Sequence, residues 1–280
     1  MKLVVDSGSS KADWAIISQG KVLSCFQTKG FNPLFFSERE MKQFLLEQKQ
    51  IQIIIGHVRQ VYFYSPGFSH VDSRNRLHDT LESVFKESSI FLESDLLGAC
   101  RSVYHSQPLF VSILGTGSNT TFYDGQSMQK ISPSLGFILG DEGSGASLGR
   151  KLIKDYLRKQ LPEDIYIHFS KAHSISLERV LSSVYQEEYP NRFLASYVPF
   201  LSKYIAHDYT QCMLRKEFQK YFELNLLLHP MHADFPISFI GSVAFFFQDV
   251  LRQIALENGL KVSEIIQSPI NTLLEFHMRD

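Results

Sequence analysis

Short apolar runs alternate along the chain with longer segments in which apolar residues recur every three or four positions. Runs rich in Val, Ile and Phe predict strands, whereas the longer spacing predicts helices. The first part of the chain predicts strands at residues 2–5, 13–17 and 22–27, one or two strands within 51–65, and a strand at 88–94. It predicts helices at residues 37–49, 78–88 and 95–105. This alternation indicates an α/β fold.

The second half of the chain begins as the first half does. A strand predicted at 109–114 leads into a Gly-rich turn, GTGSN, and a further extended segment. Aligning DSGSSKADW with GTGSNTTFY superposes Gly8 on Gly117 and Ser9 on Ser118. Because turns between strands reuse Gly and Ser widely, this similarity leaves duplication and coincidence about equally open.

The remainder is mainly helical. Amphipathic segments are predicted at 148–161 and within 168–228, and residues 235–256 predict a strand, a Gly-Ser turn and a helix. The phenylalanines at 245–247 are expected in the core. The Ser-Pro pair at 268–269 provides a good N-cap and first helical residue, so it predicts a last helix.

Composition excludes several classes of protein. With 28 Lys and Arg against 29 Asp and Glu, the net charge of -1 gives no general basic field for nucleic acid. Asp6 interrupts the first apolar run, and no run of 18 apolar residues occurs, so we expect neither a signal peptide nor a membrane span. Three distant cysteines suggest buried small side chains, not disulfides or a metal site. We expect a soluble cytoplasmic protein.

The turn that follows the first predicted strand, from Asp6 to Lys11, places a carboxylate beside several small residues. Small side chains let backbone N–H groups converge on an anion such as phosphate. The Asp6 carboxylate could hold a hydrated magnesium ion, which takes one or two carboxylates together with waters and phosphate oxygens. A plain hairpin turn explains the same residues, and this segment alone favours that alternative.

A second turn, Gly115 to Asn119, offers the same backbone chemistry without the acid. It is neither a Walker A loop nor a GxGxxG motif, because Gly115 and Gly117 are followed by Thr120 where a third glycine is needed. A plain turn again explains it alone. Two such turns at the starts of two α/β halves are, however, what a nucleotide held between duplicated domains would need.

Two further acidic positions are candidates. Asp141 and Glu142 lie among three glycines before an amphipathic helix, where they either bind a ligand or complement the helix dipole. Asp95 lies where a predicted strand passes into a helix, so it is either an N-cap or a residue facing the ligand crevice of an open sheet. The ten histidines show no metal-ligand spacing.

The order of these segments resembles the N-acetylglucosamine kinase-like branch of the BadF/BadG/BcrA/BcrD ATPase family, within the actin-like ATPase and sugar kinase superfamily. DSGSSKADWAI is similar to a phosphate-one hairpin, LGTGSNTTFYDG to a phosphate-two hairpin, LGDEGSGASLG to an interface motif and FIGSVA to an adenosine motif. The resemblance spans essentially the whole chain. It implies two ribonuclease-H-like (actin-like ATPase) domains that face a central cleft, residues 1–108 with the C-terminal helix 266–280, and residues 109–265.

The resemblance also implies ATP and Mg²⁺ as cofactors, with Asp6 as the magnesium-associated carboxylate and Asp95 as the catalytic base. The other residues that it places at the nucleotide are Gly8, Ser9, Ser10, Lys11, Gly115, Thr116, Gly117, Ser118, Gly241 and Ser242. Those that it places at the sugar are Asn32, Ser65, Gly67, Thr116, Gly117 and Asp141. Pro66, and Gly-Ser in place of Gly-Gly at 241–242, depart from the family pattern and leave the substrate's identity open.

The activity that the resemblance implies is phosphoryl transfer from ATP to an amino sugar, first of all the 6-hydroxyl of N-acetylglucosamine. It implies a small-molecule substrate, no nucleic acid, no membrane and a chain that fits a homodimer. The alternative is an actin-like nucleotide-dependent ATPase or regulator without sugar kinase activity. Asp95 and Asn32 beside the phosphate turns argue against that alternative.

Overall fold

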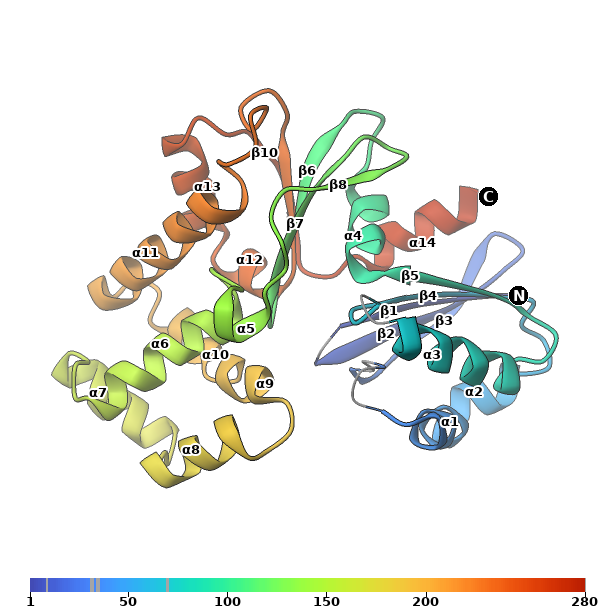
Figure 1. Cartoon of the computed structure of the whole chain (residues 1–280), viewed down its shortest axis with the longest axis horizontal. Coiled ribbons are helices and arrows are strands. Elements are labelled where there is room, and N and C mark those ends of the chain that lie inside the picture. The colour runs from blue at the N-terminus through green and yellow to red at the C-terminus, as the bar shows by residue number, and fades with distance from the viewer. Residues whose placement is uncertain (9, 31–32, 34–35, 69–70, 280) are drawn as a thin grey trace. The chain divides into compact units, whose positions relative to one another are not determined.

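The computed structural model describes residues 1–8, 10–30, 33, 36–68 and 71–279 (Figure 1). Contacts divide the chain into two compact units. Unit 1 comprises Met1–Tyr104 and Pro269–Asp280, and unit 2 comprises His105–Ser268. None of the helices in the described ranges has both the length and the apolar content needed to cross a membrane.

Unit 1 is built on a five-stranded sheet in the order β3-β2-β1-β4-β5. The first three strands form an antiparallel meander, and β4 and β5 extend the sheet parallel to β1. The strands are β1 (Lys2–Ser7), β2 (Lys11–Ser18), β3 (Lys21–Lys29), β4 (Gln60–Ser65) and β5 (Ser89–Ser94). The helices are α1 (Glu38–Glu47), α2 (Lys49–Ile54), α3 (Val71–Val84), α4 (Asp95–Val103) and α14 (Ile270–Arg279).

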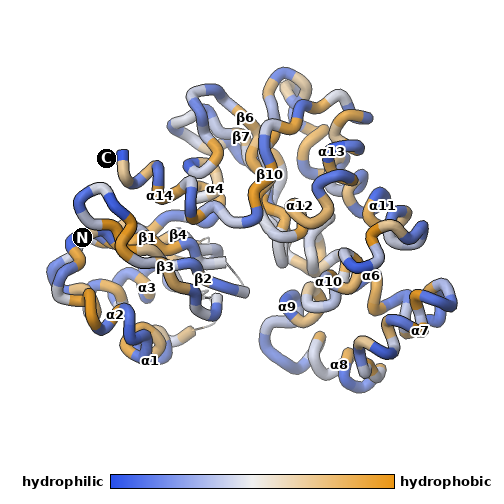
Figure 2. The backbone as a smooth tube through the Cα atoms, turned by 180° about the vertical axis from the view of Figure 1, so that it is seen from behind, coloured by the Kyte–Doolittle hydropathy of each residue, from blue (hydrophilic) through white to orange (hydrophobic). Residues whose placement is uncertain are grey.

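Both faces of this sheet are covered. Leu3 and Val5 of β1 point into the core shared with α1, α2 and α3. Val4, between them, points to the opposite face and packs with Leu273 and Leu274 of α14. Successive strand residues face opposite sides of a sheet, so a central strand that is buried on both sides has a continuous apolar run. Figure 2 shows such hydrophobic stretches along the inner strands.

Unit 2 repeats this topology with the order β10-β9-β6-β7-β8. Its strands are β6 (Leu109–Leu114), β7 (Ser118–Tyr123), β8 (Met128–Lys130), β9 (Ile237–Ile240) and β10 (Val262–Ile266). Its helices are α5 (Gly136–Leu139), α6 (Gly145–Leu157), α7 (Glu163–Ala172), α8 (Leu177–Tyr185), α9 (Pro190–Ala195), α10 (Val198–Lys203), α11 (Asp208–Asn225), α12 (Ser242–Phe246) and α13 (Gln248–Glu257). The α/β class and the duplicated architecture are confirmed.

The two opening hairpins correct the alignment made from sequence. In unit 1 the Gly8 N–H donates to the Lys11 carbonyl at 2.9 Å, and in unit 2 the Gly115 N–H donates to the Gly117 carbonyl at 3.0 Å. Gly8 is therefore equivalent to Gly115, not to Gly117. The sequence alignment has a constant offset of 109 residues, whereas the strand register gives 107 before the turn and 106 after it, since the second turn is one residue shorter.

One predicted strand is a helix. Within 51–65, only Gln60–Ser65 forms a strand, and the apolar run before it belongs to α2. Ile51 and Ile54 are buried while Ile53 is 75% exposed, which is helical spacing and not alternation. A run of consecutive isoleucines fits either period, so tertiary packing decided the outcome.

Several expectations at other positions were wrong. The strand β10 was not predicted. The last helix, predicted from the Ser-Pro pair at 268–269, begins at Ile270. Phe247 is buried but Phe246 is 54% exposed, because consecutive residues of a helical segment face different directions. Of the cysteines only Cys100 is buried, and Cys25 and Cys212 are exposed. Cys25 lies on β3, an edge strand that pairs with another strand on one side only.

Candidate active site

Asp6 lies near the carboxyl end of β1, opposite Asp13 of β2 and Tyr64 of β4 in the strand register. Asp13 is compensated by Lys11, whose Nζ lies 3.0 Å from its Oδ2, and by Gln27, whose Nε2 donates to its Oδ1 at 2.6 Å. Burial raises the pKa of the Asp6 carboxyl to about 7, helped by the negative charges of Asp95 and Asp13 and opposed by Lys11. Ionisation of Asp6 is therefore unfavourable in the folded protein, and a bound cation would offset this penalty.

Asp95 is the first residue of α4, where it was expected either to cap the helix or to face a ligand. The cap is its neighbour Ser94, whose Oγ accepts the Leu97 N–H at 3.1 Å. Asp95 Oδ1 accepts the Leu96 N–H at 2.9 Å. Burial raises the pKa of the Asp95 carboxyl to about 6, and backbone hydrogen bonds such as that from Leu96 oppose the rise.

The topology brings Asp6 and Asp95 to one edge of the sheet. Strands β1, β4 and β5 are parallel, so their carboxyl ends meet there, and Ser65 at the end of β4 pairs with Ser94 at the end of β5. Residues at this edge of an open sheet usually form its ligand site. The two carboxylates are near enough for the charge of Asp95 to act on Asp6.

Other predicted residues of unit 1 surround this edge. Ser65 is buried, and its hydroxyl donates to the Pro66 carbonyl at 3.1 Å. Gly67 has a φ of +90°, which favours glycine, and its carbonyl accepts the Ser73 hydroxyl at 3.0 Å. Ser10 is exposed in the β1–β2 turn. The predicted residues Ser9 and Asn32 lie outside the described residues.

In unit 2 the Gly-rich turn lies on the start of α6. The Gly145 and Ala146 N–H groups donate to the carbonyls of Gly115 and Thr116 at 2.8 and 3.0 Å. A Cβ at Gly145 would lie 3.1 Å from the Gly115 carbonyl oxygen, so a side chain there would require the turn to move slightly. The first turn of α6 therefore holds the turn that follows β6.

The Asp141 side chain contacts the same turn. Its Oδ1 accepts the Ser118 N–H at 3.2 Å, and a Cβ at Gly117 would lie 2.9 Å from its Oδ2. Burial raises the pKa of the Asp141 carboxyl, the Ser118 hydrogen bond opposes this, and the charge of Glu142 adds to it. Asp141 also has a φ of 56°, uncommon for a residue with a side chain.

The segment at Gly241, from a third part of the chain, lies beside the end of β6. Gly241 ends β9, has a φ of +123°, and donates its N–H to the Ile266 carbonyl at 2.9 Å. A Cβ there would lie 2.3 Å from the Leu114 carbonyl oxygen. Ser242, which follows it, is exposed at the start of α12. Three motifs chosen separately from sequence thus converge at one edge of the unit 2 sheet.

Sequence reasoning missed Tyr221 beneath this edge. Its hydroxyl bonds the Ser112 hydroxyl, and it lies 2.7 Å from Thr120 Oγ1. A Cβ at Gly143 would lie 3.0 Å from Tyr221 Cβ, so this tyrosine supports the Asp141 loop from below. A tyrosine on the apolar face of α11 carries no sequence signal of this role.

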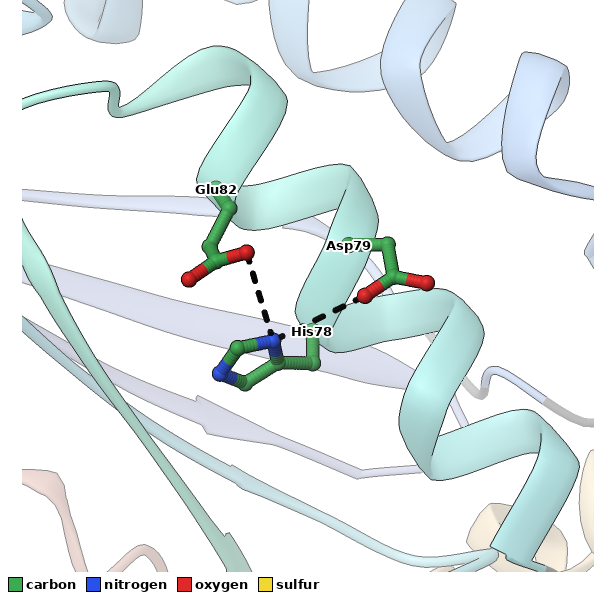
Figure 3. A group of neighbouring side chains, drawn as sticks. All are labelled: His78, Asp79 and Glu82. Carbon is green, nitrogen blue, oxygen red and sulfur yellow. Dashed lines mark ion pairs between the residues drawn. The ribbon is translucent and has the colours of Figure 1, made fainter.

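A separate cluster on α3 has the residue types of a metal site. His78 Nδ1 lies 3.7 Å from both Asp79 Oδ1 and Glu82 Oε2 (Figure 3). The three side chains are 41%, 69% and 60% exposed, respectively. Charged groups at this spacing are typical of a solvated helix surface, and we assign the cluster no part in the site.

Comparisons with known proteins first define a fold class. The structure is similar to that of a ROK family glucokinase from Streptomyces griseus in complex with glucose and AMPPNP, at 13% identity, 98% of this chain, 97% of that chain and a TM-score of 0.56. That likeness shows the fold of two-domain sugar kinases with actin-like ATPase architecture. No family model and no curated protein matches the sequence.

Two solved structures are described as "putative N-acetylglucosamine kinase". One, from Porphyromonas gingivalis, is 35% identical over 100% of this chain and 99% of that chain, with a TM-score of 0.94. The other, from Chromobacterium violaceum, is 18% identical over 98% of each chain, with a TM-score of 0.66. The chain belongs to the N-acetylglucosamine kinase-like family of actin-like ATPase sugar kinases.

Proposed function

We propose that the protein is an ATP-dependent amino-sugar kinase that converts N-acetylglucosamine to N-acetylglucosamine 6-phosphate. The observation that carries the proposal is the pair of carboxylates, Asp6 and Asp95, at the carboxyl edge of the unit 1 sheet in a chain of this family. Each unit also has a Gly-rich turn of the kind whose backbone N–H groups bind phosphate.

Asp6 is the residue that would hold magnesium. Its carboxyl has a raised pKa and a second carboxylate acting on it, so a divalent cation would relieve both costs, which fits this ion. When bound, magnesium shields the charge of the phosphates. Asp6 would hold it through its carboxylate, while Lys11, half-exposed beside Asp13, adds positive charge at the same turn.

The hairpins limit which turn groups can bind phosphate. The N–H groups of Gly8 and Gly115 close their own hairpins, and that of Ser118 is bonded to Asp141. We therefore assign phosphate contacts to the rest of the turns, Ser9 and Ser10 in unit 1 and Thr116 and Gly117 in unit 2. The role of Gly8, Gly115 and Ser118 is to shape these turns.

Asp95 acts as the general base. Its raised pKa of about 6 leaves it mostly ionised near neutral pH, and more basic than an ordinary aspartate. It accepts the proton of the sugar hydroxyl while the oxygen bonds to the γ-phosphorus and the bond from that phosphorus to ADP breaks. General-base catalysis of this kind contributes about 10² to 10⁴ in rate.

The remaining predicted residues bind rather than react. We assign Asp141 of unit 2, and Asn32, Ser65 and Gly67 of unit 1, to sugar binding, and the turn at Gly241 and Ser242 to adenine or ribose. These assignments are supported by the resemblance and by the convergence of the unit 2 motifs. A cytoplasmic location and a homodimer remain predictions, and gel filtration with light scattering tests the latter.

A sugar panel tests the proposed function. ATP turnover is measured with N-acetylglucosamine, N-acetylmannosamine, glucosamine and glucose, and without sugar. We expect stimulation by an N-acetylated amino sugar and formation of its 6-phosphate, identified by mass and by NMR. Hydrolysis that no sugar stimulates would instead support an actin-like ATPase, and a neutral hexose as the best acceptor would overturn the amino-sugar assignment.

A further inference from the structure

We propose that Tyr64 is a positioning residue that fixes the Asp95 end of α4 against the sheet, and that α14, the last helix of the chain, holds Tyr64 in place. The proposal rests on the proposed function only in giving Asp95 a catalytic role. The contacts that carry it all lie within unit 1.

Tyr64 lies between the strands that bear the site. In the strand register it pairs with Asp6 of β1 on one side and with Glu93 of β5 on the other. It precedes Ser65 at the end of β4 and is fully buried. A displacement of this residue would therefore act on the strand ends that carry the two carboxylates.

The ring of Tyr64 sets how closely α4 approaches the sheet. A Cβ at Gly98 would lie 2.8 Å from Tyr64 Cδ1 and 3.0 Å from Cγ, so the ring packs directly on the backbone of α4. Gly98 follows Asp95 by three positions, which places both on one side of the helix. Glycine costs about 1 kcal/mol relative to alanine in a helix interior, and this contact explains its presence.

The hydroxyl of Tyr64 is held from two helices. Arg101 of α4 donates to it from Nη1 at 2.8 Å, and His277 Nε2 of α14 lies 2.9 Å from it. Arg101 also reaches Glu93, with Nη2 3.5 Å from Oε1. His277 is itself buried, and its carbonyl accepts Lys2 Nζ at 3.0 Å. The tyrosine is thus tied to the helix that carries Asp95 and to the end of the chain.

Packing alone would not require this hydroxyl. The apolar side chains packed with Tyr64 include Val4, Ala15, Leu273 and Leu274. A phenylalanine would fill the same space and lose only the bonds to Arg101 and His277. Burying a hydroxyl is costly unless it is hydrogen-bonded, and here the bonds lead to α4 and α14.

Two variants test the proposal, one at each partner of the contact between Tyr64 and α4. Tyr64→Phe removes the hydroxyl, and Gly98→Ala adds a methyl group that must push α4 away from the ring. We expect each to lower kcat about tenfold or more with little change in KM, because misplacing a reacting group by about 1 Å can cost about a hundredfold in rate. Tyr123→Phe, which loses a bond to the Gly125 carbonyl, and Gly56→Ala, which has open space, are the matched controls.

A second measurement does not depend on activity. The Leu96 N–H donates to Asp95 Oδ1, so its hydrogen exchange and chemical shift report how Asp95 is held. We expect faster exchange of the Leu96 N–H in both variants and no change in its exchange rate in the controls. His277→Gln, which keeps a polar partner for the hydroxyl, should retain more kcat than His277→Leu.

The outcomes separate the two claims. Wild-type kcat and unchanged Leu96 exchange in both Tyr64→Phe and Gly98→Ala would overturn the positioning role, even if melting temperatures fell. If the wild-type protein phosphorylates no sugar, the proposed function fails, and faster Leu96 exchange in the two variants would still support the positioning of Asp95.

Discussion

The two units share one topology and differ in what their sheet edges carry. In unit 1 the edge bears Asp6 and Asp95, whose pKa values are both raised by burial. The hairpin register makes Ile113 of unit 2 the equivalent of Asp6, so the second sheet has no acid there. Unit 2 instead has glycines in close backbone contact, at Gly145 and Gly241. We infer that the unit 1 edge supplies the reacting carboxylates, whereas the unit 2 edge is shaped by glycine contacts, with Asp141 beside them.

The sharpest test of this division is Asp95→Asn. The change removes the base without changing its size, so turnover should fall about 10² to 10⁴. Sugar affinity, measured by calorimetry with the variant, should remain close to that of the wild type. Wild-type turnover in Asp95→Asn would end the assignment of the chemistry to unit 1.

On the unit 2 side, Gly241→Ala tests whether close approach is essential. The new Cβ would lie 2.3 Å from the Leu114 carbonyl oxygen at a φ of +123°. We expect the free energy of unfolding to fall by about 3 kcal/mol or more, from overpacking and from the backbone conformation together. Nucleotide affinity should fall as well.

Gly259→Ala is the matched control for Gly241→Ala. Gly259 has a φ of +73° with open space around its Cβ position, so alanine there meets the conformational cost alone. That cost is about 1 to 2 kcal/mol. Equal losses in free energy of unfolding for the two variants would contradict the role of contact at Gly241.

The charge of unit 1 should also appear in the pH dependence of stability without magnesium. The folded-state pKa of Asp6 is raised from 3.8 to about 7, so the folded protein binds the proton more tightly than the unfolded chain does. Stability contributed by the protonated carboxyl is therefore lost as pH rises from about 4 to 7. Asp6→Asn should be more stable than wild type at pH 8, by about 1 to 3 kcal/mol, and nearly equal to it at pH 4.

Asp124 of unit 2 is a control, because its pKa is shifted in the direction opposite to that of Asp6. Hydrogen bonds from Ser127 and Gln126 lower the pKa of the exposed Asp124 carboxyl. The stability contributed by the ionised Asp124 carboxylate is present at neutral pH and is lost as pH falls. At pH 8, Asp124→Asn should therefore be less stable than the wild type. Chemical unfolding of wild type and both variants from pH 4 to 8 measures the difference. If the free energy of unfolding has the same pH dependence in the wild type and in Asp6→Asn, then ionising Asp6 does not destabilise the folded protein.

Much of this division could be predicted from the sequence, and the remainder depended on register. The glycine turns and the acids after strands were visible because turn chemistry and strand ends are local properties. The isoleucine run of α2 was misassigned because consecutive apolar residues fit both periods. The equivalence of Gly8 with Gly115, and the contacts of Tyr64 and Tyr221, follow from strand pairing that no local pattern records.

The smallest effect that still separates the units is that of Asp141→Ala. Asp141 accepts one backbone N–H and covers the Gly117 turn, so its loss should weaken sugar binding about tenfold, the worth of one hydrogen bond to a charged group. The kcat at saturating sugar should change less than KM, because Asp141 is assigned to sugar binding and Asp95 to proton transfer. Asp141→Asn, which keeps the size and an acceptor oxygen, should recover part of the affinity. A larger loss in ATP affinity than in sugar affinity, measured by calorimetry, would contradict the assignment of Asp141 to sugar binding.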